Sequence, residues 1–215
     1  MTRAFDARAE EPSIYLIATP AQAPAGEFLD RLRAALVAGV DLVQLRDKEL
    51  EGAELRELGH SVQAICRELG RPLIVNDDPR LALELRAEGL HLGQEDLAPA
   101  AARAIVGPRC MVGLSTHSIP QIRAACADVD VDGIGIGPIF PTRTKDAGAP
   151  LGPEIWTAMS SIAGLKPAWA IGGIDLDRLP LLVARGCRRI AVASAILGAD
   201  DVGVTVARFR ALLAG

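Results

Sequence analysis

Aromatic residues are scarce in this sequence: phenylalanine, tryptophan and tyrosine together make up 3% of its 215 residues. Aliphatic side chains must therefore fill the core of a chain in which 50% of the residues are hydrophobic. Such a composition suits strands that are buried on both faces, as in parallel sheets, better than the aromatic stacking surfaces that bind single-stranded nucleic acid. The scarcity of aromatics thus favours an α/β protein and argues against a nucleic-acid-binding module.

The chain also lacks an excess of positive charge and a long apolar run. Its 23 lysines and arginines against 27 acidic residues give a formal net charge of −4, so no overall basic field attracts a polyanion. No run of about 18 uncharged apolar residues is present that could span a membrane. The charged start, residues 1–12, is unlike a signal peptide. We therefore expect a cytoplasmic protein with no membrane or nucleic-acid partner.

Closely spaced cysteine pairs are absent as well. The four cysteines, Cys66, Cys110, Cys126 and Cys187, are far apart in the chain and form no C-x-x-C motif. Structural zinc sites and disulfide-framed domains depend on such clusters. The pattern predicts four reduced thiols in apolar or helical surroundings.

Eight short aliphatic runs recur along the chain, and each is followed by a longer amphipathic segment. About 27 residues per unit is close to the lower length limit of a (β/α)8 TIM barrel, whereas an open doubly wound sheet usually has fewer strands. No linker composition divides the chain. The sequence predicts one α/β TIM-barrel domain over residues 1–215, with residues 1–12 as a loosely ordered extension. The predicted strands are Ile14–Ala18, Leu42–Leu45, Leu73–Asn76, Leu90–Leu92, Met111–Ser115, Gly133–Gly137, Ala168–Gly172 and Ile190–Ala193.

Polar residues follow nearly every predicted strand, where the loops of such barrels carry the chemistry. Asp77 and Asp96 end neighbouring strands, and paired carboxylates bind Mg²⁺ or act as acid and base. Arg46, Lys48 and Lys145 would face the same mouth. Carboxylates and cations around one cavity indicate a phosphate-bearing substrate neutralised by Mg²⁺ together with basic side chains. The carboxylates of Asp78, Glu95 and Asp146 are instead interpreted as surface ion pairs, which contribute little.

Two glycine-rich or small-residue turns, Ile171–Ile174 and Ala193–Ile196, follow the seventh and eighth predicted strands. Glycine lets backbone N–H groups approach an anion, and the loops after these two strands form the common phosphate site of TIM barrels. The segment 137–152 is too long for an ordinary βα loop. Its hydroxyl and cationic donors predict a lid over a phosphorylated ligand.

Histidine and tryptophan residues give weaker signals. We expect His60 on a helix surface and His91 as a structural hydrogen-bonding residue. His117, beside Ser115, is open to two interpretations, an acid–base group or a helix cap. The tryptophans, Trp156 and Trp169, are expected to be packing residues.

Taken together, six motifs resemble thiamine phosphate synthase, in the order typical of that family and over the range from Tyr15 to about Phe209. Each motif alone is modestly specific, but six in order are highly specific. They are Val43-Gln-Leu-Arg-Asp-Lys48, Val75-Asn-Asp-Asp78, His91-Leu-Gly-Gln-Glu-Asp96, Gly113-Leu-Ser-Thr-His117, Gly135-Ile-Gly-Pro-Ile-Phe-Pro-Thr-Arg-Thr-Lys145 and Ala170-Ile-Gly-Gly-Ile174.

The resemblance implies a Mg²⁺-dependent transferase that joins hydroxymethylpyrimidine diphosphate to thiazole phosphate and releases pyrophosphate. It implies Asp77 and Asp96 as metal ligands, with small molecules as partners, and it is compatible with a homo-oligomer. The pyrimidine diphosphate would be bound by Gln44, Leu45, Arg46, Asp47, Lys48, Asn76, Ser115 and Lys145. The thiazole phosphate would be bound by Thr142, Arg143, Thr144, Gly173, Ala193 and Ser194. Of these, Arg46, Lys48, Ser115 and Lys145 would act in catalysis.

Two alternatives stay open at this point. A thiazole tautomerase of the same fold lacks the metal-and-diphosphate residues and uses a histidine in the segment that holds His117. A non-catalytic barrel that binds a phosphate ligand would keep the glycine turns without needing Asp77 and Asp96. The sequence departs from the family at Ile17-Ala-Thr-Pro20, where many relatives have Thr-Asp, and at Arg188-Arg189, which we expect to be surface variation.

Overall fold

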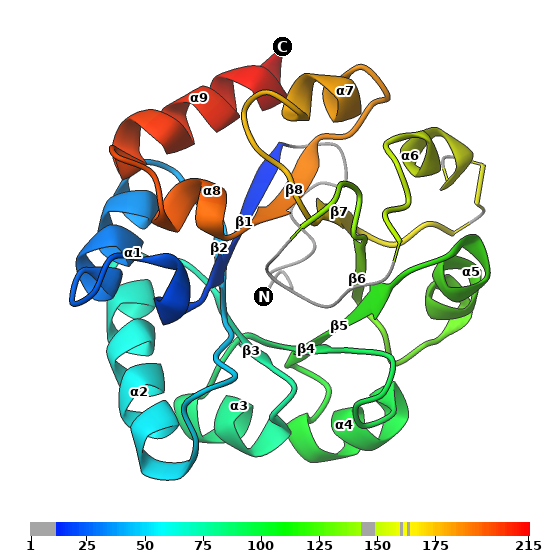
Figure 1. The fold of residues 1–215 in the computed structure, drawn as a ribbon. Coiled ribbons are helices and arrows are strands. Elements are labelled where there is room, and N and C mark those ends of the chain that lie inside the picture. The colour runs from blue at the N-terminus through cyan, green and yellow to red at the C-terminus, as the bar shows by residue number, and fades with distance from the viewer. Residues whose placement is uncertain (1–11, 143–148, 160, 163) are drawn as a thin grey trace.

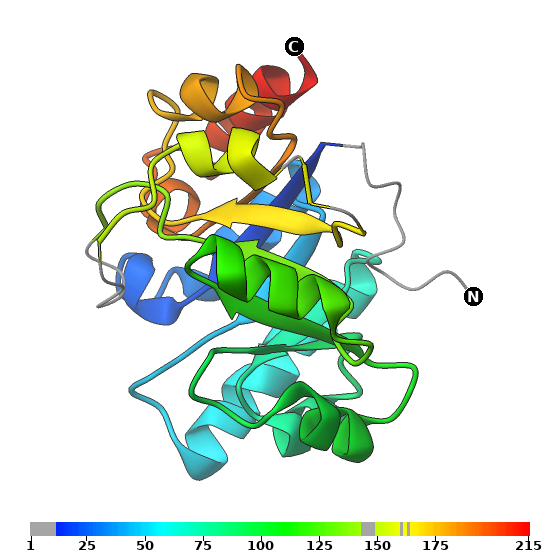
Figure 2. The same cartoon turned by 90° about the vertical axis from the view of Figure 1, so that its right-hand side faces the viewer.

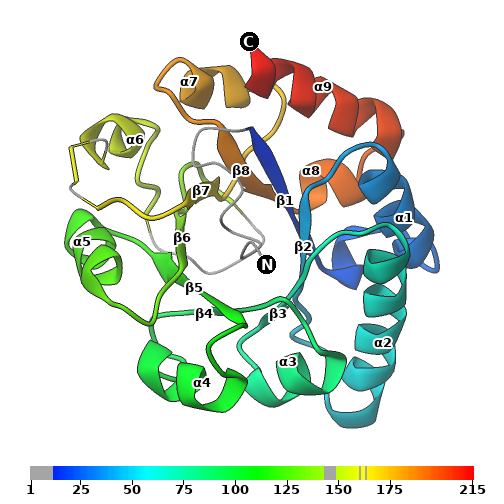
Figure 3. The same ribbon diagram turned by 180° about the vertical axis from the view of Figure 1, so that it is seen from behind.

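The computed structural model describes residues 12–142, 149–159, 161–162 and 164–215. Its strands pair in parallel and in chain order, from β1 to β8 and back to β1, and close into a barrel. Helices surround this barrel, as the two end views show (Figures 1 and 3). The predicted TIM barrel is confirmed.

The strand positions agree with the sequence prediction to within a residue or so at each end. The strands are β1 Ser13–Ala18, β2 Leu42–Leu45, β3 Leu73–Asn76, β4 Gly89–Leu92, β5 Met111–Thr116, β6 Gly133–Ile136, β7 Ala168–Ile171 and β8 Arg189–Val192. The helices are α1 Phe28–Val37, α2 Gly52–Glu68, α3 Pro79–Leu85, α4 Pro99–Val106, α5 Ile119–Ala127, α6 Glu154–Met159, α7 Leu179–Val183, α8 Ser194–Leu197 and α9 Val202–Ala214. A 3-10 turn, η1 Pro20–Gln22, follows β1.

The alternation of side chains along each strand produces two separate apolar layers. Successive residues of a strand point to opposite faces. Val43 and Leu45 of β2 belong to the large core between the strands and the helices. Leu42 of the same strand belongs to a second, smaller cluster that also contains Tyr15 and Trp169. The outer layer therefore supplies most of the buried apolar surface, and the inner layer fills only part of the barrel interior.

Glycines line one side of the barrel interior. Gly89, Gly113, Gly133 and Gly135 lie at the register positions of β4, β5 and β6 that alternate with outer-core residues. A Cβ atom at Gly113 would lie 2.5 Å from the Nδ1 atom of His91. These positions therefore leave room inside the barrel for the larger side chains that project from other strands.

The C-terminal helix closes the ring of helices. α9 lies between α7 and α1, and the side view shows its red end beside the orange α7 (Figures 1 and 2). Phe209 of α9 is fully buried in the outer core. Arg210 donates to the carbonyl oxygens of Gly39 and Pro12 and pairs with the carboxylate of Asp41. The last helix is thus joined to residues at the beginning of the described chain.

One expectation about the barrel was wrong. The adjacent arginines were expected at the surface, but Arg189 is buried, with its guanidinium carbon 5.0 Å from the centre of the Trp169 ring. As the first residue of β8 it occupies a position that alternates with Ile190, which faces the outer core. Its neighbour Arg188 donates to the carbonyl oxygen of Leu213. The period of the strand, not the polarity of the residue pair, places Arg189 inside.

Other expectations concern cysteines, membranes and the N-terminal segment. All four cysteines are free thiols, as predicted, and burial raises the pKa of Cys66 and Cys187 to about 12. Among the described residues no helix is long and apolar enough to cross a membrane. Residues 1–11 of the expected N-terminal extension lie outside the described residues.

We expect Phe209→Ala to lower the free energy of unfolding by about 3–5 kcal/mol, because the deleted ring would leave a cavity in the outer core. Urea unfolding followed by circular dichroism measures this change. Val204→Ala on the exposed side of the same helix is the matched control, and its effect should stay within about 0.5 kcal/mol. Equal effects of the two substitutions would contradict the assignment of α9 as the helix that closes the core.

Candidate active site

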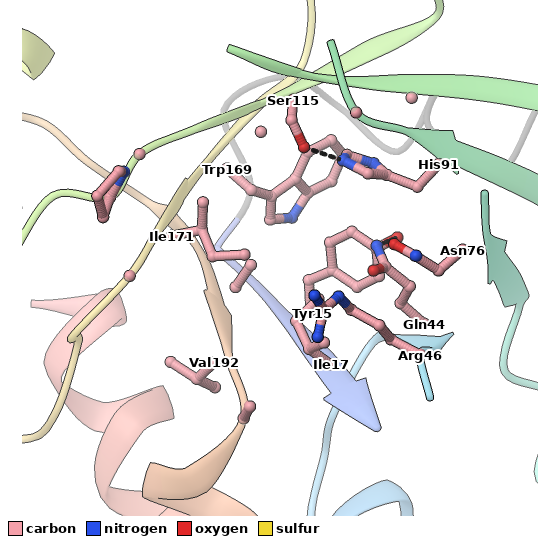
Figure 4. A pocket seen from close by; sticks show the side chains of 18 of the residues that line it. Tyr15, Ile17, Gln44, Arg46, Asn76, His91, Ser115, Trp169, Ile171 and Val192 are labelled. Atoms are coloured by element: carbon pink, nitrogen blue, oxygen red, sulfur yellow. Dashed lines mark hydrogen bonds between the residues drawn. The ribbon is translucent and has the colours of Figure 1, made fainter. Parts of the chain in front are cut away.

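A cavity of about 480 Å³ opens at the carboxyl ends of the strands and reaches into the barrel interior. Figure 4 shows polar side chains of Gln44, Arg46 and Asn76 on one side and the apolar Ile171 and Val192 on another. The carboxyl end of a TIM barrel is where the loops after the strands carry catalytic groups. This cavity is therefore the candidate active site.

Tyr15 and Trp169 form the inner end of the cavity. Their rings meet edge to face, with centroids 5.8 Å apart, and the Tyr15 hydroxyl accepts a 2.8 Å hydrogen bond from Nε2 of Gln44. Burial raises the pKa of Tyr15 far above its usual value, so the phenol stays neutral. Sequence reasoning did not select Tyr15, and it assigned Trp169 to packing alone. The alternation within Ile14–Ala18, which turns Tyr15 and Ile17 away from the outer core, was the available signal.

His91 and Ser115 form a second pair within the cavity. A 3.0 Å hydrogen bond joins Nε2 of His91 to Oγ of Ser115 (Figure 4). The Nε2 atom of Gln94 donates to the carbonyl oxygen of Ser115. The absence of a side chain at Gly113 leaves the space that the imidazole occupies. His91 thus forms a side-chain hydrogen bond, as expected, and it also lines the cavity.

The remaining histidines are also placed. His60 is exposed on α2, as expected, and its Nε2 atom lies 3.3 Å from Oε1 of Glu84. His117 lines the cavity, and its Nδ1 atom contacts the carbonyl oxygen of Gly137. Ser118, and not His117, caps α5, because its Oγ atom accepts from the N–H of Gln121.

Asp77 projects into the cavity from a tight turn that follows β3. Its φ angle of 63° lies in the left-handed region, where aspartate and asparagine are the non-glycine residues that fit best. The N–H of Asp77 donates to the carbonyl oxygen of His91, and the N–H of Asp78 donates back to the carbonyl oxygen of Asn76. The bond from Asp78 to Asn76 closes a γ-turn with Asp77 at its centre, and the bond from Asp77 to His91 joins this turn to β4. Backbone strain at a ligand-facing residue is typical of functional sites.

Asp96 lies in hydrogen-bond contact with Asp77, as the neighbouring strand ends predicted. Its Oδ2 atom accepts a 2.6 Å hydrogen bond from the N–H of Gly93. The pKa of Asp77 is raised from its usual 3.8 to about 6. The pocket atoms remove water from the carboxyl group, and the neighbouring Asp96 carboxyl disfavours a second negative charge, while Arg46 and Asn76 act in the opposite direction. The pair is therefore a site of unneutralised negative charge.

The predicted diphosphate-binding residues divide into three groups. Gln44, Arg46, Lys48, Asn76 and Ser115 all line the cavity, together with the carboxylates of Asp77 and Asp96. Leu45 and Asp47 do not line it: Leu45 packs in the outer core, and the Oδ1 atom of Asp47 accepts 2.7 Å hydrogen bonds from the N–H groups of Glu49 and Leu50. Lys145 lies outside the described residues, as do Arg143 and Thr144, which were assigned to the thiazole phosphate.

The predicted phosphate turns lie on the opposite side of the same cavity. Gly173, Ala193 and Ser194 line it with Thr142, and the short helix α8 begins at Ser194, so its first N–H groups face the region where a phosphate is expected. Gly173 has a φ of 63°, and a Cβ atom there would lie 2.5 Å from the carbonyl oxygen of Pro141. Only glycine fits this close approach of two loops.

The segment 137–152, predicted as a lid, begins and ends in a hydrogen-bonded stem. The N–H of Leu151 donates to the carbonyl oxygen of Pro138, and the N–H of Gly152 donates to that of Ile139. Ile139 in turn donates to the carbonyl oxygen of Ile171 in β7. Both ends of this segment are therefore joined to the barrel, and residues 143–148 between them lie outside the described residues.

Comparison with known proteins links this geometry to one family. The family model described as "Thiamine monophosphate synthase" matches residues 14–196. The chain is 43% identical over 187 residues to the thiamine-phosphate synthase of Acidothermus cellulolyticus, covering 87% of each chain. It is 38% identical to that of Moorella thermoacetica, covering 92% of this chain and 93% of the relative. Among solved structures, the thiamine phosphate pyrophosphorylase of Pyrococcus furiosus superposes with a TM-score of 0.84 at 29% identity, covering 96% and 97% of the two chains.

The carboxylate pair should make the stability of the metal-free protein depend on pH. Because folding raises the pKa of Asp77, its contribution favours the folded state below about pH 4 and is lost as the pH rises through about 6. Asp77→Asn removes this titration and keeps a residue suited to the left-handed turn. In urea unfolding with EDTA, we expect the variant to lose less stability than the unsubstituted protein between pH 5 and pH 8. Parallel pH profiles of the two proteins would contradict the coupling of the carboxylates.

Proposed function

The chain belongs to the thiamine monophosphate synthase family, and on that premise we propose that it joins 4-amino-2-methyl-5-hydroxymethylpyrimidine diphosphate to thiazole phosphate. The products are thiamine phosphate and pyrophosphate, so the enzyme is a transferase of the pyrimidinylmethyl group. Its substrates are small molecules. The observation that carries the proposal is one cavity with two anion-binding sides: Arg46 and Lys48 beside the carboxylate pair, and the glycine turns opposite them.

The carboxylate pair fits a magnesium ion. Mg²⁺ is typically held by one or two carboxylates, with water and substrate phosphate oxygens as the remaining ligands. The contact between Asp77 and Asp96 holds two acidic groups together, which a divalent cation would neutralise. Among the described residues no group of three or more histidine, cysteine or acidic side chains could enclose a metal by itself. We assign Asp77 and Asp96 as the protein ligands of Mg²⁺, which would neutralise charge on the diphosphate leaving group.

Substrate binding follows from the two sides of the cavity. Arg46 and Lys48 supply positive charge beside Asp77 and Asp96, where the diphosphate would lie, and Lys145 is assigned to the same group. Gln44, held by Tyr15, and Ser115, held by His91, present polar groups on fixed side chains to the pyrimidine ring. The thiazole phosphate would lie at Thr142, Gly173, Ala193 and Ser194, with Arg143 and Thr144 assigned to it by family resemblance.

The chemistry requires little proton transfer from the protein. An aminopyrimidine donates electrons into its attached CH₂ group, so departure of pyrophosphate leaves a stabilised carbocation that the thiazole nitrogen attacks. The main demand is stabilisation of the charge that develops on the leaving group, which Arg46 and Lys48 would supply from the wall of the cavity. The apolar side chains of Ile17, Ile171 and Val192 line the cavity between the two sides and would limit the access of water to the cation.

The purified protein should form thiamine phosphate from the two substrates when Mg²⁺ is present, and excess EDTA should stop the reaction because the leaving-group charge is no longer neutralised. Chromatographic detection of thiamine phosphate measures both. Absence of product with both substrates and Mg²⁺ present would overturn the synthase assignment. Conversion of the thiazole phosphate alone to an isomer would favour the tautomerase, and binding without turnover would favour a non-catalytic barrel.

Substitution of either carboxylate should abolish most turnover while the fold is kept. For Asp77→Asn and Asp96→Asn we expect kcat to fall by roughly 100-fold or more, since loss of a metal ion removes several kcal/mol of charge stabilisation. Asp78→Asn is the matched control, because Asp78 caps α3 through the N–H groups of Arg80 and Leu81 and asparagine caps equally well. Normal turnover in Asp77→Asn and Asp96→Asn would remove the metal assignment.

A further inference from the structure

The cavity continues outward, past the predicted phosphate turns, into a hollow that opens to solvent. Arg178 and Asp175, which follow the glycine turn of β7, form part of its wall, and Gln22 of η1 forms another part. None of these three residues belongs to the motifs discussed above. The hollow shares five residues with the main cavity, namely Thr142, Gly173, Ile174, Ser194 and Ala195.

Arg178 is held at this wall by contacts on three sides. Its Nη1 atom donates a 2.8 Å hydrogen bond to the carbonyl oxygen of Gly173. Its guanidinium carbon lies 5.6 Å from the centre of the Phe140 ring, and its Nε atom lies 3.6 Å from Oδ2 of Asp175. The Oδ1 atom of Asp175 also accepts from the N–H of Arg178, which fixes the backbone at the same point. The side chain thus joins the loop after β7 to the loop after β6.

The bond to Gly173 determines the direction of one peptide group. In a trans peptide the C=O and the following N–H point in opposite directions. When Arg178 binds the carbonyl oxygen of Gly173, the N–H of Ile174 is directed to the other side of the peptide plane. Within the described part of the chain, the N–H groups of Gly173 and Ile174 donate to no acceptor. Consecutive free N–H groups in a turn form a concave anion-binding site.

The turn at Gly172 and Gly173 is flexible in isolation, so the direction of its N–H groups depends on the contacts that hold it. Gly172 and Gly173 both have positive φ values, and glycine resists alternative backbone conformations less than any other residue. On the β6 side, Phe140 donates from its N–H to the carbonyl oxygen of Gly172. Arg178 supplies the next bond along the turn, at Gly173, and its stacking on Phe140 holds both loops together. The Nη1 atom of Arg178 is bound to Gly173 and its Nε atom faces Asp175, so the contacts that it makes within the described residues act on the turn.

We propose that Arg178 is a positioning residue of the thiazole-phosphate site: it holds the Gly173–Ile174 peptide so that the N–H of Ile174 faces the phosphate beside the N–H of Gly173. The proposal rests on the function assigned above and adds to it a residue outside the family motifs. Its action should be specific to one of the two substrates, because the pyrimidine diphosphate is assigned to the opposite side of the cavity.

The test compares Arg178→Ala and Arg178→Lys with Arg185→Ala. Arg185 is the matched control: it also donates to a backbone carbonyl, that of Leu181, and pairs with an acid, Glu154, outside the cavity. For Arg178→Ala we expect the KM for thiazole phosphate to rise roughly tenfold, the effect of losing one hydrogen bond from a charged donor. The KM for the pyrimidine diphosphate and the thermal midpoint should change little. Lysine, which can also donate to Gly173, should restore part of the loss, and Arg185→Ala should match the unsubstituted protein.

Two further measurements separate this inference from the function on which it rests. The unphosphorylated thiazole alcohol should react equally with the unsubstituted protein and Arg178→Ala, because the N–H groups have no phosphate to bind. Calorimetric titration of thiazole phosphate, with Mg²⁺ and pyrophosphate present, should show the same tenfold weakening without turnover. An unchanged Kd, or an equal rise of both KM values, would overturn the role of Arg178. Absence of turnover in the unsubstituted protein would instead overturn the proposed function alone.

Discussion

The packing of the outward faces of the strands against the helices is the interaction on which the rest of this structure depends. Every strand places aliphatic residues in that layer, and it buries most of the apolar surface. Because most of the stabilising packing lies between the strands and the helices, the interior of the barrel need not be filled completely. One side of it is lined by glycines, and the remaining volume holds the candidate active site. The aliphatic residues that dominate the sequence supply most of the outer layer. Inside the barrel, Tyr15 and Trp169 shape the cavity.

The same alternation explains which parts of the molecule could be predicted from the sequence. Period-two runs and the polar residues at their ends are local signals, and they correctly placed the strands and brought Asp77 and Asp96 together. Arg189 could not be placed in this way, because its neighbour Arg188 made the pair resemble a surface, whereas its strand register puts it over Trp169. The short helix α8 has only four residues, which is too few for a helical period to be recognised in the sequence.

Residues that act through other residues were the least predictable part of the site. Tyr15 holds Gln44, and Gly113 makes room for His91, through contacts between neighbouring strands of the barrel. Such roles depend on the register in which the strands pair, which cannot be read from a single sequence. Leu45 and Asp47 show a different limit: they lie within a recognisable motif, yet the side chain of one packs in the outer core and that of the other stabilises a turn. A motif identifies a segment, and only the register identifies which of its side chains face the ligand.

The bonds made by Arg210 have a consequence for the order of the chain. This residue near the C-terminus contacts Pro12, Gly39 and Asp41, so the beginning and the end of the described barrel are neighbours in space. A closed ring of repeated units has no structural first member, and neighbouring termini are what permits circular permutation. A short linker from α9 to β1, with new termini in an exposed loop at the amino ends of the strands, would therefore leave the register and the cavity unchanged. The closed order of the strands therefore does not determine which strand comes first in the chain.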